Sequence, residues 1–138
     1  MKFKGNIHKR IFTREVTRCK VKHIHRCFLS AIFLLTSSNN LWQRTRKHVS
    51  PNKIDWNAID IRGVSIQDYA LYRMAKDLYC DTSTVNYTDL SDDKIYTDHM
   101  MQLIYSAIDI RRHGMSLFDS VDRKETNNVY GQPQPKRS

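Results

Sequence analysis

The chain contains only four glycines among its 138 residues, at positions 5, 63, 114 and 131. No two of them have the spacing of a G-x-G-x-x-G dinucleotide fingerprint or of a P-loop, whose glycines let the backbone approach a phosphate. This scarcity argues against nucleotide hydrolysis by the common motifs. The sequence also lacks a repeat with a period of about 20 to 50 residues, which argues against a solenoid or a propeller.

Cysteine is scarce as well, with three residues, Cys19, Cys27 and Cys80. They cannot all pair within one chain, and their spacing is unlike that of disulfide-rich domains, so we expect a reducing compartment and a cytoplasmic location. The longest apolar run, residues 27–35, is interrupted only by Ser30 and has nine residues, whereas a membrane-spanning helix needs about 20. The run follows basic residues, as in a secretory signal, but the charged leader would be unusually long and no typical cleavage site follows it. We therefore expect neither secretion nor a membrane partner.

One group of residues invites comparison with metal sites. Cys19, His23, His25 and Cys27 place four potential zinc ligands within nine residues. Their spacing matches neither the C-x₂₋₄-C nor the H-x₃₋₅-H pattern, and tetrahedral sites usually draw their ligands from more than one element. A core position for Cys27 and a surface position for the histidines explain the pattern more simply. We expect no bound metal and no cofactor.

No local pattern indicates an active site. The acidic pair Asp92 and Asp93 falls in a segment rich in turn-forming residues, and no base or nucleophile stands at a fixed offset from it. We therefore expect a binding protein rather than an enzyme. Catalytic groups assembled from distant positions leave no local trace, so an enzyme with such a site is the alternative.

Positive charge is unevenly distributed along the chain. Residues 1–48 contain twelve lysines and arginines and one acidic residue, Glu15, whereas residues 49–122 contain seven basic residues and twelve aspartates. This division favours either an acidic partner for the N-terminal third or pairing with the chain's own aspartates. The acidic partner is nucleic acid or, alternatively, an acidic protein surface. The predicted contact residues are Lys9, Arg10, Arg14, Arg18, Lys20, Lys22, Arg26, Arg44, Arg46 and Lys47.

The nucleic-acid hypothesis predicts phosphate contacts with occasional base stacking, because ring-bearing side chains are interleaved with the basic residues. These side chains are Phe3, Phe12, His23, His25 and Trp42. The one candidate for a helix-turn-helix, residues 95–121, would place Asp119 and Asp122 against the phosphates. Charge alone therefore supports binding that tolerates many sequences.

Apolar residues that recur every three or four positions predict three helices that form the core, at residues 24–35, 66–79 and 98–112. Hydroxyl residues precede the second and third of these as N-caps. The alternation of strands and helices that a parallel sheet requires is missing. We therefore predict an all-α single domain over residues 1–122, with about four or five helices.

The remaining segments have less regular patterns. Residues 3–22 are compatible with a helix or with a strand, and residues 41–50 predict a short helix that stops before a proline. Residues 54–62 predict an extended connector or a short strand. A short helix is expected at residues 116–121, and residues 123–138 are predicted to form a flexible tail.

Several core and cap segments together resemble a known family of proteins. They are Phe28-Leu-Ser-Ala-Ile-Phe-Leu-Leu-Thr36 with the following Leu41-Trp42, then Ser65-Ile-Gln-Asp-Tyr-Ala-Leu-Tyr-Arg-Met-Ala-Lys-Asp-Leu-Tyr79, and Ile104 to Gly114. They resemble small, uncharacterised helical proteins carried on conjugative elements and prophages of Gram-positive bacteria. The resemblance covers residues 27–114 and implies a cytoplasmic accessory protein of a mobile element. It transfers no catalytic residue and does not extend to the first 26 residues.

Overall fold

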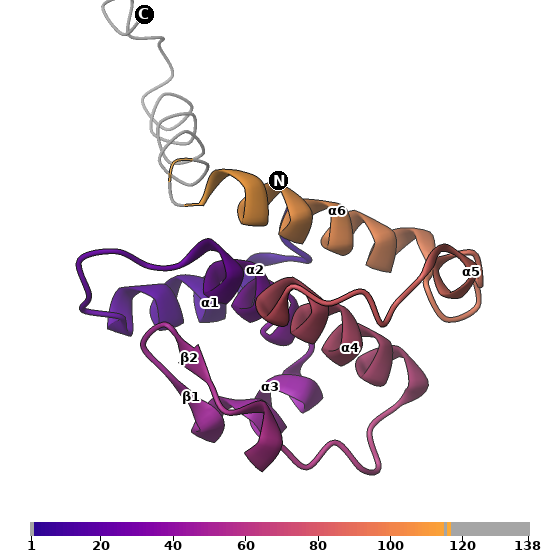
Figure 1. Cartoon of the computed structure of the whole chain (residues 1–138), viewed down its shortest axis with the longest axis horizontal. Helices are drawn as coiled ribbons and strands as arrows, with labels where there is room; N and C mark the ends of the chain where they lie inside the picture. The colour runs from indigo at the N-terminus through magenta and orange to yellow at the C-terminus, as the bar shows by residue number, and fades with distance from the viewer. Residues whose placement is uncertain (1, 115, 117–138) are drawn as a thin grey trace, which may run out of the picture.

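Figure 1 shows the protein as a computed structural model, which describes residues 2–114 and 116. Within these residues the helices are α1 (Asn6–Arg18), α2 (Arg26–Leu35), α3 (Asn39–Thr45), α4 (Ile66–Cys80), α5 (Tyr87–Leu90) and α6 (Asp98–His113). Two 3₁₀ turns, η1 (Arg46–His48) and η2 (Trp56–Ala58), accompany the strands β1 (Val49–Ser50) and β2 (Lys53–Ile54). The all-α prediction is confirmed. Apart from Ser116, the helix predicted at 116–121 and the tail predicted at 123–138 lie outside the described residues.

Helix α2 is the centre of the fold. All side chains of residues 28–35 are buried, as expected of a helix that is apolar on every side. Helices α4 and α6 both pack against it, as Figure 1 shows. Ser30 is satisfied inside the core because its hydroxyl donates to a backbone carbonyl of the preceding turn at 3.0 Å. The helix predicted over residues 24–35 is thus confirmed, and it begins at Arg26.

Hydroxyl side chains cap the N-termini of three of the helices. Ser38, Ser65 and Thr97 each accept a hydrogen bond from the backbone N–H three residues later, at 3.4, 3.0 and 3.2 Å. They start α3, α4 and α6, respectively. Helix α6 is followed by Gly114, whose φ of 64° is a conformation that favours glycine. Local capping therefore gives α4 and α6 the bounds predicted from the sequence to within one residue.

Helix α1 occupies most of the segment whose pattern fitted either a helix or a strand. It packs on α2 through the rings of His8 and Phe12, which contact the ring of Phe33 on α2. Phe3, which precedes α1, contacts His8 and Phe33. We call the rings of Phe3, His8, Phe12 and Phe33 the aromatic cluster. The ring of Phe33, which belongs to α2, lies 4.7 Å from His8 and 5.8 Å from Phe12 between ring centroids. Because α2 is the main helix against which α1 packs, the aromatic cluster attaches α1 to the core.

His8 is buried in the aromatic cluster, and both of its ring nitrogens have a partner. Its Nδ1 accepts a hydrogen bond from the backbone N–H of Lys4 at 2.9 Å, so Nε2 carries the proton and donates to the carbonyl of Phe33 at 2.8 Å. Burial lowers the pKa of His8 to about 4, against the opposing effect of the hydrogen bond to Phe33, and the nearby charge of Lys4 lowers it further. The neutral imidazole is therefore the form that fits this site.

A two-residue turn joins β1 to β2 and holds the loop that precedes α2. Asn52, at φ 60°, occupies the left-handed position of this turn, which asparagine tolerates better than most residues. Its side-chain oxygen accepts from the backbone N–H of His25 at 2.8 Å, and its side-chain nitrogen donates to the carbonyl of His23 at 2.7 Å. Residues 54–62, predicted as a connector or short strand, contain Ile54 of β2 and the turn η2.

Helix α5 was not predicted from the sequence. It is four residues long and begins with a capping box, in which Asn86 and Asp89 each accept a hydrogen bond from the other's backbone N–H, at 2.9 and 3.0 Å. The segment before it is organised by the buried carboxylate of Asp77 on α4. The hydroxyls of Thr82 and Thr84 donate to Oδ1 at 2.6 and 2.8 Å. The Val85 backbone N–H donates to Oδ2 at 2.8 Å.

These hydrogen bonds determine the charge state of Asp77. Burial raises the pKa of the carboxyl, but the hydrogen bonds from residues 82–85 together outweigh that effect, so its pKa lies below the ordinary value. The Asp77 side chain therefore stays ionised and fixes the connection between α4 and α5.

Replacing Asp77 with alanine should lower the free energy of unfolding by about 2 kcal/mol, because three donors lose a charged acceptor. The loss should not be larger, since Thr82 and Thr84 are exposed and their hydroxyls can turn to water. Urea denaturation followed by circular dichroism measures this change. The control is Asp93→Ala, an exposed aspartate, which should change stability by less than about 0.5 kcal/mol. Equal effects of the two substitutions would contradict the structural role of Asp77.

Candidate nucleic-acid interface

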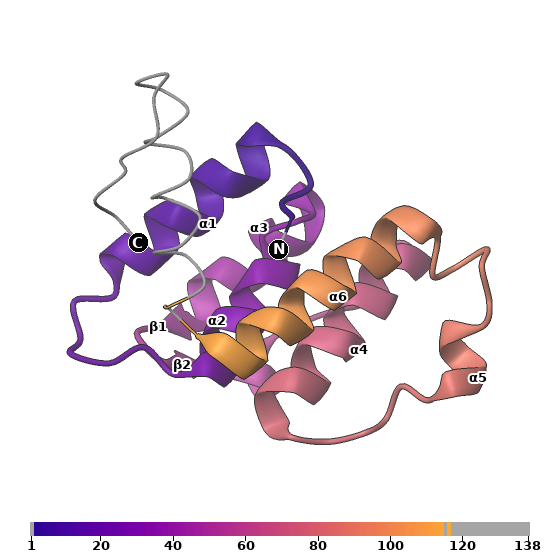
Figure 2. The ribbon, with the colours of Figure 1, turned by 90° about the horizontal axis from the view of Figure 1, so that it is seen from above.

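A group of exposed cations lies at one end of the molecule, and three aspartates lie near the other end. In Figures 1 and 2 the C-terminal end of α1, the loop after it and the β1–β2 hairpin lie on the left, whereas α5 lies on the far right. Asp89, Asp92 and Asp93 belong to α5 and the turn that follows it. We call the left-hand end the basic face. Its exposed cations are Arg18, Lys20, Lys22, Arg26, Arg46, Lys47, Lys53 and Arg112.

Helix α1 carries a row of arginines that ends at the basic face. Arg10, Arg14 and Arg18 are spaced four residues apart and therefore share one side of the helix. All three are exposed, whereas Phe12 on the other side of the helix is in the core. Lys9 is half-buried and lies outside this row. The row extends the basic face along α1.

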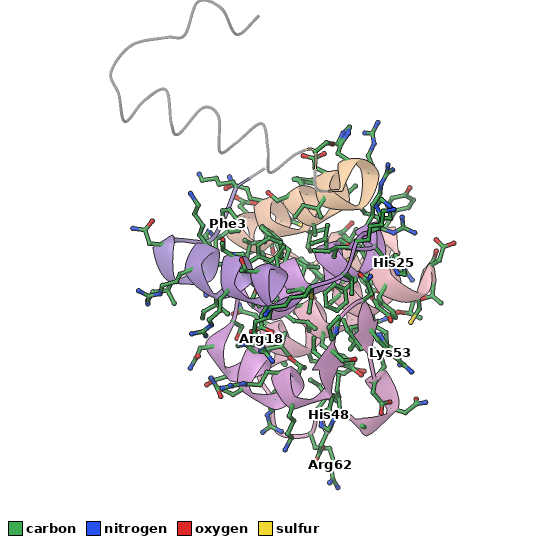
Figure 3. The ribbon with its side chains drawn as sticks, turned by 90° about the vertical axis from the view of Figure 1, so that its left-hand side faces the viewer. Phe3, Arg18, His25, His48, Lys53 and Arg62 are labelled. Carbon is green, nitrogen blue, oxygen red and sulfur yellow. The ribbon has the colours of Figure 1, made fainter. Side chains whose placement is uncertain are left out.

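The loop of residues 19–25 and the hairpin bring further cations to the same end. Lys20 and Lys22 are exposed on this loop, which the side chain of Asn52 holds against the hairpin. Lys53 follows the hairpin turn directly. Figure 3 views this end of the molecule, with Arg18, His25, His48 and Lys53 labelled. The side chain of Asn52, through its hydrogen bonds to the backbone of His23 and His25, thus holds the cations of the 19–25 loop beside Lys53 of the hairpin.

The end of α6 also joins the basic face. The Arg26 guanidinium donates to the carbonyl of Arg112 at 2.8 Å, across 86 positions of sequence. A Cβ at Gly114 would lie 3.0 Å from Cγ of Arg26, so glycine allows this close approach. The contact places Arg112 and His113 beside the loop, where Lys22, His23, Arg26 and His113 line a pocket of about 380 Å³. Sequence reasoning missed Lys53 and Arg112 as members of this surface, because no local pattern reports contacts between distant segments.

Two parts of the sequence-based interface are corrected by the structure. Phe12 and Trp42, which were expected to stack on bases, are each only 2% exposed and belong to the core. Phe3, a half-buried member of the aromatic cluster, packs on Phe12. Arg44 is half-buried and donates to the carbonyl of Asp60 at 3.2 Å, so it supports the chain after η2. Sequence alone could not separate these core roles from surface roles, since the aromatic residues lie among basic ones.

Ion pairs between described residues involve few of the predicted contact residues. Arg18 pairs with Glu15 of the same helix at 2.9 Å. Asp89 pairs with Arg73 of α4 at 3.8 Å. Arg62 pairs with Asp60 at 3.0 Å. None of these pairs joins the basic face to the aspartates near α5. The charge of Lys20, Lys22, Arg46 and Lys47 is therefore presented to solvent.

The cysteines and histidines considered as metal ligands lie around the loop before α2. Across residues 2–114 and 116, no three histidine, cysteine, aspartate or glutamate side chains are grouped so that they could hold a metal ion. His23 and His25 are exposed, and Cys27 is half-buried at the start of α2. Burial raises the pKa of the Cys19 thiol, with smaller opposing and reinforcing effects from its neighbours.

None of the helices in the described part of the chain is long and apolar enough to cross a membrane. Comparisons of the chain with models of protein families, with curated proteins and with solved structures gave no match. Proposals about function therefore rest on the residues and their arrangement.

Proposed function

We propose that the protein is a non-enzymatic accessory or regulatory protein that binds nucleic acid through the basic face. The observation that carries this proposal is the convergence of exposed cations from α1, the 19–25 loop, the hairpin and η1 at one end of the molecule. Phosphates are the natural partners of such a surface, because each cation that contacts one releases a condensed counterion. The acidic residues near α5 lie at the other end and do not oppose this approach.

The proposed contacts are to the nucleic-acid backbone and tolerate many sequences. Phe12 and Trp42 are in the core and unavailable for stacking, while the exposed lysines and arginines can contact phosphates of any sequence. The resemblance of residues 27–114 to proteins of conjugative elements and prophages suggests the setting, a mobile element in the bacterial cytoplasm. An acidic protein surface is the alternative partner for the same cations.

The proposal is tested by fluorescence anisotropy with labelled duplex DNA of mixed sequence, titrated with protein over a salt series from about 50 to 300 mM. Log K should fall linearly with log salt. The double variant Lys20→Gln/Lys22→Gln should weaken binding on every duplex and reduce the magnitude of this slope by about 2, since each duplex contact contributes about 0.9. Arg10→Gln/Arg14→Gln should act in the same direction if the row on α1 also contacts phosphates. Arg18 is kept in both variants because it pairs with Glu15.

The matched control is Lys94→Glu, which lowers the net charge by the same two units on the exposed segment between α5 and α6. It should leave the salt slope unchanged. Equal effects of the control and of Lys20→Gln/Lys22→Gln would show that net charge rather than the basic face governs binding. Absence of binding at about 50 mM salt, where a modest set of phosphate contacts is hardly weakened, would contradict the proposal and favour an acidic protein partner.

A further inference from the structure

The pocket of the basic face contains two histidines that are far apart in the sequence. His23 belongs to the 19–25 loop, and His113 is the last residue of α6. Both line the pocket of about 380 Å³, which we call the histidine pocket. The loop is held at the carbonyl of His23 by the side chain of Asn52, at 2.7 Å. The end of α6 is held beside the start of α2 by the bond from Arg26 to the carbonyl before His113, as Figure 2 shows.

Both imidazoles are accessible to a ligand. The side chains of His23 and His113 are exposed, and neither has a hydrogen-bond partner among the described residues. The described residues that line the histidine pocket include Lys22 and Arg26 and no acidic residue. A proton on either imidazole therefore adds to positive charge that already faces an approaching anion.

The charges around the two imidazoles are mostly positive. The neighbouring cations, which come from the loop, α2 and α6, are Lys20, Lys22, Arg26 and Arg112. The acidic side chain nearest to His113 along α6 is Asp109, which is half-buried and forms no ion pair with a described residue. The C-terminal end of α6 attracts a cation whether or not an anion is bound. A phosphate among these groups adds the opposite charge that favours protonated imidazoles.

We propose that one phosphate of the bound nucleic acid enters the histidine pocket, and that His23 and His113 each take up a proton from solvent as it does so. This inference rests on the proposed function and adds regulation by pH to it. An ordinary histidine changes its charge between about pH 5 and pH 8, whereas lysine and arginine remain charged throughout this range. Binding of nucleic acid should therefore strengthen as the pH falls through this range.

The proposal is tested by fluorescence anisotropy with the intact protein and a duplex of mixed sequence at pH 8, 7 and 6, at a constant ionic strength of about 0.1 M. The dissociation constant should fall about fivefold from pH 8 to pH 6, since each of two exposed ion pairs contributes a factor of about two to three. Circular dichroism at each pH checks that the protein is folded. Equal affinity at the three pH values would overturn this proposal alone, whereas absence of binding at every pH would contradict the proposed function as well.

The double variant His23→Gln/His113→Gln assigns the pH dependence to the histidine pocket. At pH 8, where an ordinary imidazole is neutral, its affinity should lie within about twofold of the parent affinity. From pH 8 to pH 6 its affinity should increase by no more than about twofold, because the two ion pairs cannot form.

The matched control is His99→Gln, since His99 is exposed in the first turn of α6, at the opposite end of that helix from His113. It should retain the full fivefold increase. A double variant that retains the full increase would assign it to His25 and His48 and overturn the role of the pocket. A double variant weakened equally at pH 8 and pH 6 would show contacts without proton uptake, which would also overturn the proposal.

Discussion

Replacing Phe33 with alanine should lower the free energy of unfolding by about 3 to 5 kcal/mol, the usual range for removing a fully buried phenylalanine. The side chain is 0% exposed and lies between α1 and the rest of the core. Its ring contacts Phe3, His8 and Phe12, so its removal opens a cavity where α1 is attached. Urea denaturation gives the change in free energy, provided that the slope with denaturant is unchanged.

Local measurements should show where the effect of Phe33→Ala is concentrated. Backbone amides of α1 should exchange with solvent faster relative to those of α4, because α1 depends on the aromatic cluster. Tyr87→Ala removes an aromatic side chain that is 89% exposed and should change stability by less than about 0.5 kcal/mol. A loss in Phe33→Ala no larger than in this control would contradict the proposed attachment of α1.

Acidification should destabilise the protein through His8 by about 3 kcal/mol. The pKa of His8 is about 4 in the folded protein and has an ordinary value of 6.5. Between these values the unfolded chain binds a proton at this position that the folded chain does not bind. The free energy of unfolding should therefore rise with pH across this window, and the contribution of His8 should be lost progressively as the pH falls from about 6.5 to about 4.

The variant His8→Gln isolates this contribution from those of the other titratable groups. A glutamine can donate to the carbonyl of Phe33 as Nε2 does, but it cannot take up a proton. The difference in unfolding free energy between the parent and His8→Gln, measured by urea denaturation from pH 4 to pH 7, should therefore vary with pH by about 3 kcal/mol. Parallel pH profiles would show that the folded protein accommodates a protonated His8.

The helices that the sequence predicted well are those whose signals are local. Helices α2, α4 and α6 have apolar residues at helical spacing, and Ser65 and Thr97 cap the latter two. The signal for helix α1 is weaker, because Phe12 and Val16 have helical spacing with Cys19 but residues 19–23 alternate as a strand would. The attachment of α1 also depends on Phe33 of α2, which is distant in sequence. Helix α5 was missed although Asn86 and Asp89 form a recognisable capping box.

The candidate interface was predictable in its charges but not in its geometry. Counting lysines and arginines identified the N-terminal third, yet the contribution of Arg112 arises from its contact with Arg26, far away in the sequence. The reverse error occurred for Phe12 and Trp42, whose basic neighbours suggested a surface role. Composition reports which groups are present, whereas only packing decides which of them face solvent.

The separation of charge between the basic face and the α5 end also has a kinetic consequence, which precedes any contact. An excess of cations at the basic face and of aspartates near α5 gives the molecule an electric dipole. In the proposed binding of nucleic acid, the field of the polyanion would orient this dipole during diffusion. Encounters would then occur with the basic face leading, so fewer collisions are lost to wrong orientations and the association rate increases. This gain in association rate should decline as salt shortens the Debye length from about 30 Å at 0.01 M to about 8 Å at 0.15 M. At the higher salt concentration, the interaction of the more distant end with the polyanion is largely screened.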